Sequence, residues 1–219
     1  MRDYQVSRVN EFVEALADFH LPNVFNPYTD ACPAHDYDGS PIVRRNNLIA
    51  VLEGAFQVGV ETMWFGRDLG YRGGRRTGLA LTDEAHLDLV RLTYHAMPVE
   101  QATTTGPIAE RTAREIWRIV RQLSRPPFLW NVFPFHPHEP DDPMSNRCHT
   151  AQEARACEDI IATLLNWIKP TKAVALGKEA HRALTRLGWT SVYVRHPSYG
   201  GQAEFVSCIR AIYGLSAAA

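Results

Sequence analysis

Hydrophobic positions follow two patterns along the chain: the three- to four-residue spacing typical of helices, and short continuous runs typical of buried strands. The helical spacing predicts helices over residues 1–20, 46–56, 108–123, 151–168, 177–187 and 202–215. The short apolar runs predict strands over residues 61–65, 128–132, 173–176 and 191–194. Between them, residues 21–43 are rich in Pro, Asp and Tyr and are predicted to form an extended loop.

The alternation of short apolar strands with helices predicts the fold class. It favours an α/β protein with a central, mainly parallel four-stranded sheet covered on both faces, a three-layer α/β/α sandwich. The length of 219 residues fits a single domain over 1–219, in which 1–43 supply an N-terminal helix and the extended loop.

Composition narrows the class of protein. Hydrophobic residues make up 45% of the chain, which is enough for a substantial core. No run reaches the roughly 18 apolar residues that a membrane span needs, and the N-terminus has no apolar signal-peptide core, so we expect a cytoplasmic protein. The net charge of −1 does not exclude a nucleic-acid partner, because such a footprint depends on where the charge lies.

The cysteines and histidines do not form a recognisable metal motif. The four cysteines include no C-x-x-C pair, and the closest two, Cys148 and Cys157, are nine residues apart. Buried free thiols are therefore the expectation, and no cofactor is expected. The segment 133–149 contains His136 and His138 with two aspartates, but a solvated loop is favoured there over a metal site.

Three unusual loops, at 66–78, 131–149 and 195–201, directly follow predicted strands. The first contains five glycines in thirteen residues, which predicts an irregular segment whose backbone turns sharply or approaches a ligand closely. In open α/β folds ligands bind at the carboxyl ends of the strands. Functional residues of the three loops are therefore expected to meet along one edge of the sheet.

The motifs in these loops resemble those of the uracil-DNA glycosylase superfamily. The segments that carry the resemblance are Gly66-Arg67-Asp68-Leu69-Gly70, Thr77-Gly78-Leu79, Phe128-Leu129-Trp130-Asn131 and Arg195-His196-Pro197-Ser198. They combine features of the family-1 enzymes and of the single-strand-selective monofunctional uracil glycosylases. The resemblance covers roughly residues 44–212 and implies excision of a damaged base from DNA.

The resemblance implies a role for each polar residue. Asp68 and His196 are the candidate catalytic residues: the carboxylate would stabilise a cation-like sugar or orient water, and the imidazole would donate to the base oxygen as negative charge develops. Asn131 would match the acceptor O4 and the donor N3–H of uracil with one amide. The alternatives are structural: an aspartate that caps a turn, an ordinary loop histidine, and an asparagine that ties down its loop.

The remaining candidates line the base pocket or contact DNA. The base-binding candidates besides Asn131 are Arg67, Leu69, Gly70 and Leu81. The DNA-binding candidates are Arg72, Arg75, Arg76, Ser198, Tyr199 and Gly200, with the arginines on phosphates and Tyr199 as a wedge at the gap left by a flipped base. A solvated arginine-rich loop and an exposed tyrosine without a role are the alternatives.

Two positions depart from the family-1 pattern. Gly70 stands where those enzymes have the tyrosine that blocks the methyl group of thymine, and Leu81 stands where a phenylalanine stacks on uracil. Phe135 or Tyr28 are guesses for a replacement ring. These departures predict a roomier pocket that admits other deaminated bases, such as hypoxanthine or xanthine.

The sequence favours a monomeric, monofunctional glycosylase acting on single- or double-stranded DNA that contains uracil or another deaminated base. A non-catalytic or covalently trapping DNA-binding member of the same fold is the second hypothesis. A nucleotide-binding hydrolase or transferase is the third, although the glycine-rich loop lacks both the G-x-x-x-x-G-K-[ST] and the G-x-G-x-x-G patterns.

Overall fold

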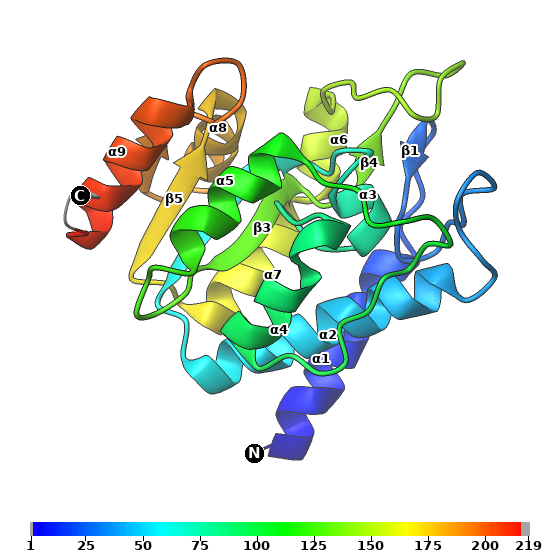
Figure 1. Cartoon of the computed structure of the whole chain (residues 1–219), viewed down its shortest axis with the longest axis horizontal. Coiled ribbons are helices and arrows are strands. Elements are labelled where there is room, and N and C mark those ends of the chain that lie inside the picture. The colour runs from blue at the N-terminus through cyan, green and yellow to red at the C-terminus, as the bar shows by residue number, and fades with distance from the viewer. Residues whose placement is uncertain (1, 216–219) are drawn as a thin grey trace.

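The computed structural model describes residues 2–215, with side chains from residue 7 onward (Figure 1). Its helices are α1 (Arg2–Ala17), α2 (Ser40–Val58), α3 (Gly74–Thr77), the 3₁₀ helix η1 (Glu84–His86), α4 (Leu87–Tyr94), α5 (Arg111–Val120), α6 (Ala151–Ala156), α7 (Glu158–Ile168), α8 (Lys178–Arg186) and α9 (Gln202–Tyr213). Its strands are β1 (Val24–Phe25), β2 (Thr62–Asp68), β3 (Phe128–Phe133), β4 (His136–Pro137), β5 (Lys172–Leu176) and β6 (Ser191–Val194).

A parallel sheet forms the middle layer, with the strand order β3-β2-β5-β6. Helices α5 and α9 lie in front of this sheet in Figure 1, and α7 lies behind it. The predicted three-layer α/β/α fold is therefore confirmed. Within residues 2–215, none of the helices combines the length and the apolar character required to cross a membrane.

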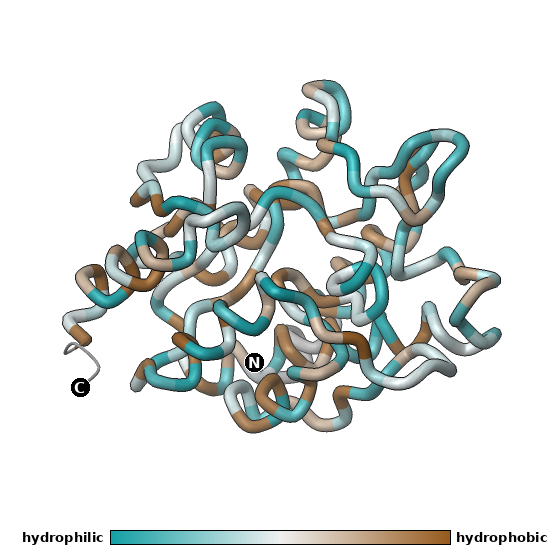
Figure 2. Tube along the Cα trace, turned by 45° about the horizontal axis from the view of Figure 1, so that its top comes forward, coloured by the Kyte–Doolittle hydropathy of each residue, from teal (hydrophilic) through white to brown (hydrophobic). Residues whose placement is uncertain are grey.

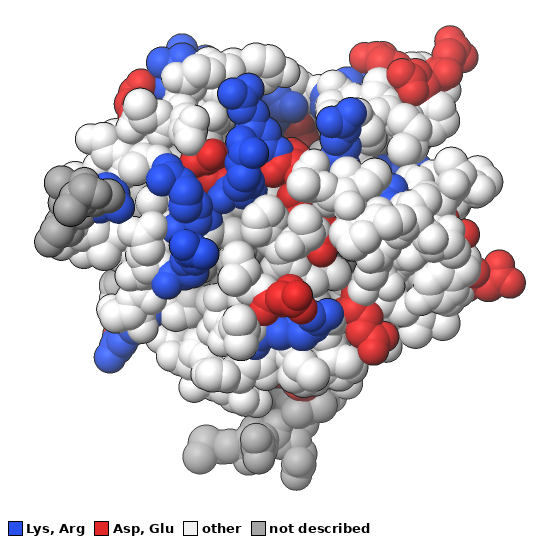
Figure 3. Space-filling model, viewed as in Figure 1, with Lys and Arg blue, Asp and Glu red and all other residues white. Residues whose placement is uncertain are grey.

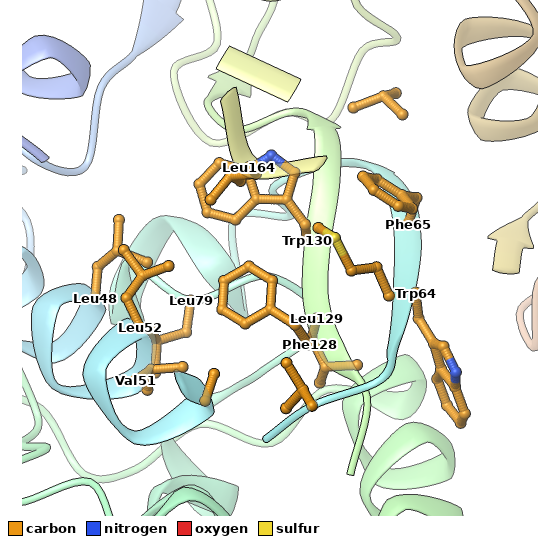
Figure 4. Packing of buried hydrophobic residues seen from close by; sticks show 14 of the residues in the cluster. Leu48, Val51, Leu52, Trp64, Phe65, Leu79, Phe128, Leu129, Trp130 and Leu164 are labelled. Atoms are coloured by element: carbon orange, nitrogen blue, oxygen red, sulfur yellow. The ribbon is translucent and has the colours of Figure 1, made fainter. Parts of the chain in front are cut away.

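Aromatic side chains fill the core on both faces of the sheet. Phe128 and Trp130 of β3 stack on each other and face α2 (Figure 4), whereas Trp64 of β2 points to the opposite face. There its ring lies 6.2 Å from the ring of Phe205 and 5.9 Å from that of Tyr213, both on α9. Hydrophobic stretches accordingly lie in the strands and inner helix faces, and hydrophilic ones in the outer loops (Figure 2).

Several element boundaries differ from the sequence prediction. Helix α2 begins at Ser40 rather than near Asn46, because Pro41 in the first turn is compatible with a helix start. The helix predicted over 151–168 is divided at Cys157 into α6 and α7. The helical segment 84–94 and the antiparallel β1–β4 pair were not predicted, since each is too short to show a hydrophobic period.

Two predicted loops are more ordered than expected. Strand β2 continues through Asp68, and Gly74–Thr77 form a helical turn, so only part of 66–78 is irregular. The prediction of a solvated loop at 133–149 is wrong for its first part, because Phe135 and His136 are fully buried beside the β1–β4 pair. Among the cysteines, the expected burial holds for Cys32 and Cys157, whereas Cys148 is exposed.

A buried arginine fastens the glycine-rich loop to the N-terminal part of the chain. The Arg44 side chain is 0% exposed, forms an ion pair of 2.5 Å with Asp36, and donates from Nε to the backbone oxygen of Arg76. Tyr28 donates its hydroxyl to the backbone oxygen of Gly78 over 2.8 Å. Gly78 has a φ of 72°, and a Cβ there would lie 2.8 Å from Cβ of Arg44, so glycine is required at this contact.

We expect the Arg44→Ala variant to lose about 3–5 kcal/mol of unfolding free energy, because it leaves the carboxylate of Asp36 buried without its partner. Chemical denaturation measures this loss. The control is Arg45→Ala, which removes an exposed ion pair with Glu14 and should change stability by less than about 1 kcal/mol. Equal losses in the two variants would contradict a clamping role for Arg44.

Candidate functional site

The register between β2 and β3 places Gly66 directly beside Asn131. The Asn131 side chain is 1% exposed, and neither its Oδ1 nor its Nδ2 has a hydrogen-bond partner among the described residues. A Cβ on Gly66 would lie 2.3 Å from Oδ1, so a glycine at this position is needed to leave room for the amide. A buried amide without partners is costly and therefore points to a ligand that supplies them.

Leu81 also lies beside Gly66, next to the Asn131 amide. Its Cδ2 would be 2.9 Å from a Cβ on Gly66, and its φ of 55° is in the left-handed region. This backbone conformation costs free energy for a residue with a branched side chain, and such strain is often found at ligand sites. The structure thus brings Leu81 together with Asn131, two of the predicted base-binding residues.

Asp68 ends β2 with its carboxylate held from two sides. Its side chain is 4% exposed, and it accepts hydrogen bonds from Nε of Arg67 and from Nδ1 of His149. The Arg67 side chain is partly exposed and the His149 ring is buried. The two partners fix the direction of the carboxylate, so Asp68 does more than cap a turn.

His149 was not found by sequence reasoning, which placed it in a solvated loop. It directly precedes Thr150, and Thr150 forms a capping box with Glu153 at the start of α6. The Thr-x-x-Glu spacing is visible in the sequence and predicts a fixed helix start. It would have indicated that His149 has a defined position, although not that it faces Asp68.

His196 is held in one tautomer by its own loop. The backbone N–H of Ser198 donates to Nδ1 over 3.2 Å, and the Ser198 hydroxyl lies 2.8 Å from the same atom. Because Nδ1 accepts, the neutral ring carries its hydrogen on Nε2. Burial, and secondly the charge of Arg67, lower the pKa of His196 to about 4. The ring is therefore a neutral donor at neutral pH.

The tip of this loop projects into solvent. Tyr199 is 96% exposed, and it and Gly200 have positive φ values of 49° and 77°. Gly201 packs so closely that a Cβ would lie 2.1 Å from the backbone oxygen of His196. The turn therefore places the Tyr199 ring in solvent, on a backbone that packs against His196. Ser198 hydrogen-bonds to the imidazole of His196.

Glu110 is a second residue that the sequence did not reveal. A Cβ on Gly73 would lie 2.2 Å from its Oε2, and one on Gly70 would lie 3.4 Å from its Oε1. Burial, and secondly the charge of Asp83, raise the pKa of Glu110. The carboxyl group therefore lies against the glycine-rich loop, while the neighbouring Leu69 is buried and packs against Gly74.

The predicted phosphate-binding arginines separate into two groups. Arg72 is exposed and donates to the Tyr71 hydroxyl. Arg75 and Arg76 are both 2% exposed, which withdraws them from any surface that DNA could reach. Arg76 pairs with Glu84 at 2.9 Å.

Arg75 is buried for a structural reason. Its guanidinium lies 3.7 Å from the ring centre of Phe25 and donates to Nδ1 of His136 and to the backbone oxygen of Pro143. Burial, and secondly the charge of Arg75, lower the pKa of His136 to about 3, which keeps that ring neutral as an acceptor. Arg75 therefore joins the β1–β4 pair to the glycine-rich loop.

The positions of Phe135 and Tyr28 do not support either of them as the ring that stacks on the base. Phe135 is 0% exposed and stacks on Phe19 at 4.9 Å, and Tyr28 is buried with its hydroxyl on Gly78. Both rings belong to the core under the glycine-rich loop. The side chain that lies beside the Asn131 amide is the aliphatic Leu81.

Comparisons with known proteins identify the family and the fold. The family model described as "Uracil DNA glycosylase superfamily" matches residues 54–210, which is well over half of the chain. The crystal structure of wild-type SMUG2 from Pedobacter heparinus is similar in fold, with a TM-score of 0.59, 13% sequence identity, and coverage of 94% of this chain and 98% of that chain. No curated protein sequence matches the chain.

We expect the His196 imidazole to titrate near pH 4, so that its NMR ring signals stay constant from pH 8 to about pH 5. Replacing Arg67 by Gln should raise this pKa, because a neighbouring positive charge disfavours the protonated ring. A histidine model peptide in the same buffer provides the reference near pH 6.5. Titration of His196 near 6.5 would contradict the buried, neutral state.

We expect Asn131→Leu to leave the unfolding free energy unchanged or to raise it by about 1–3 kcal/mol, because it removes a buried amide without partners. The matched control is Asn47→Leu. The Asn47 amide is buried and hydrogen-bonded to Thr77 and Glu100, so that substitution should destabilise the protein. Comparable losses in both variants would show that Asn131 has a structural partner.

Proposed function

This chain belongs to the uracil DNA glycosylase superfamily, and we propose that it hydrolyses the N-glycosidic bond of uracil in DNA and leaves an abasic site. The observation that carries the proposal is the Asn131 amide, which is buried against Gly66 and has no hydrogen-bond partner among the described residues. Uracil offers the complementary groups, since its O4 accepts from Nδ2 and its N3–H donates to Oδ1.

Asp68 acts on the sugar side of the bond. As the bond between C1′ and the base nitrogen breaks, positive charge develops on the sugar, and the carboxylate stabilises it and orients the attacking water. The water oxygen bonds to C1′, and its proton leaves to solvent or to the carboxylate. Arg67 and His149 bond to the carboxylate and hold it in position.

His196 acts on the base side of the bond. The electron pair of the broken bond stays on the base, whose anion accepts a hydrogen bond from Nε2–H and then takes up a proton. A donor placed where charge develops lowers the barrier by several kcal/mol. A neutral ring suffices, and the low pKa of His196 means that this donor is present throughout the neutral range.

The base range of the enzyme extends beyond uracil in this proposal. Gly70 has no side chain to close the pocket, and Leu81 supplies an aliphatic surface instead of a ring. Hypoxanthine and xanthine are the additional substrates we propose, with the base flipped out of the stack and Tyr199 filling the gap. Exposed Arg72 and the backbone at Ser198 and Gly200 contact phosphates.

The test is incubation with single- and double-stranded oligonucleotides that contain one uracil, followed by alkaline cleavage at abasic sites. We expect Asp68→Asn and His196→Ala each to slow excision by about 10²–10³-fold or more while binding to the oligonucleotide persists. Arg45→Ala is the control because Arg45 is distant in sequence from these loops and pairs with Glu14.

Parallel substrates with hypoxanthine or xanthine measure the base range. Absence of abasic product from every substrate, with a folded protein, would overturn the catalytic proposal. Tight or covalent retention on uracil DNA without turnover would favour a non-catalytic or trapping member of the superfamily. Stabilisation by nucleotides in place of uracil DNA would favour a nucleotide-binding enzyme.

A further inference from the structure

Exposed arginines form a stripe along α5. They are Arg111, Arg114, Arg118 and Arg121, spaced three, four and three residues apart, the last of them capping the helix. At 3.6 residues per turn this spacing keeps all four on one side of the helix. The opposite side is buried and includes Ile116 and Trp117. Figure 3 shows the corresponding band of positive side chains over α5.

The acidic residues near α5 do not neutralise the positive charge of the arginine stripe. Glu115 is the acid within α5, and it is buried, where it lies 3.1 Å from Nε of Arg118 and 3.7 Å from Nε of Arg114. Its carboxylate therefore orients two of the guanidinium groups from beneath. No ion pair is recorded for Arg111 or Arg121 within the described part of the chain. The stripe is a local excess of positive charge on a chain whose net charge is −1.

The stripe begins at the candidate active site. Glu110, which immediately precedes α5, lies against Gly70 and Gly73 of the glycine-rich loop, and exposed Arg72 is in the same loop. From Arg111 to Arg121 the helix rises about 15 Å, at about 1.5 Å per residue. That length corresponds to roughly four nucleotides of one strand, at about 3.4 Å each.

We propose that the arginine stripe of α5 binds the phosphate backbone of the DNA strand that flanks the target base. The chemistry of the surface fits this partner, because guanidinium groups bind phosphate oxygens in a bidentate manner and a regular row of them matches a regular row of phosphates. The inference rests on the proposed function for the identity of the nucleic acid. It assigns α5 a role outside the base pocket.

The experiment measures the affinity for undamaged oligonucleotides against salt concentration, and excision separately. Replacing Arg111 and Arg121 by Ala should reduce the slope of log K against log[salt] by about 0.9 per arginine on duplex DNA, or about 0.7 on a single strand. Lysine at both positions should restore the slope, since it keeps the charge. Arg45→Ala should leave it unchanged, and thermal denaturation verifies that each variant is folded.

The outcomes separate this inference from the proposed function. A reduced slope in a protein that excises no base would support the stripe and overturn the catalytic proposal. Excision together with an unchanged slope in the alanine variants would overturn the stripe. A wild-type protein that binds no DNA at low salt would overturn both.

Discussion

The parallel register between β2 and β3 is the constraint on which the site depends. It places Gly66 beside Asn131 and Asp68 beside Phe133, so the Asn131 amide and the Asp68 carboxylate come from adjacent strands of a buried sheet. A shift of β3 by one residue would turn the Asn131 side chain to the opposite face of the sheet, away from Asp68. The packing of Phe128, Trp130 and Trp64 in the core prevents such a shift. The core packing that stabilises the sheet therefore also sets the positions of the site residues.

Arg67 is the positively charged residue that affects both Asp68 and His196. Its guanidinium bonds to Asp68, and its charge also helps to lower the pKa of His196. One cation therefore holds the Asp68 carboxylate in position and favours the neutral form of the His196 imidazole.

The sequence predicted the four strands and most of the long helices because their apolar residues follow a clear period. It also singled out Asp68, Asn131 and His196 as candidates, because each stands in a motif at or next to a strand end, and their roles stay predictions. It did not reveal His149 or Glu110, since each reaches its neighbours only through tertiary packing. The burial of Arg75 and Arg76 was missed for a related reason: their partners, His136 and Glu84, lie in segments without a recognisable period.

The attachment of the glycine-rich loop through Arg44 and Tyr28 makes the loop depend on the N-terminal part of the chain. The family model matches residues 54–210. The two side chains that hydrogen-bond to the backbone of the loop come from residues before that range. The glycine-rich loop and the residues that hold its backbone therefore lie in different parts of the sequence, the first inside and the second before the range that the family model matches. Grafting the motif-bearing segment onto another N-terminal region would transfer the reactive groups without the surface that sets their positions.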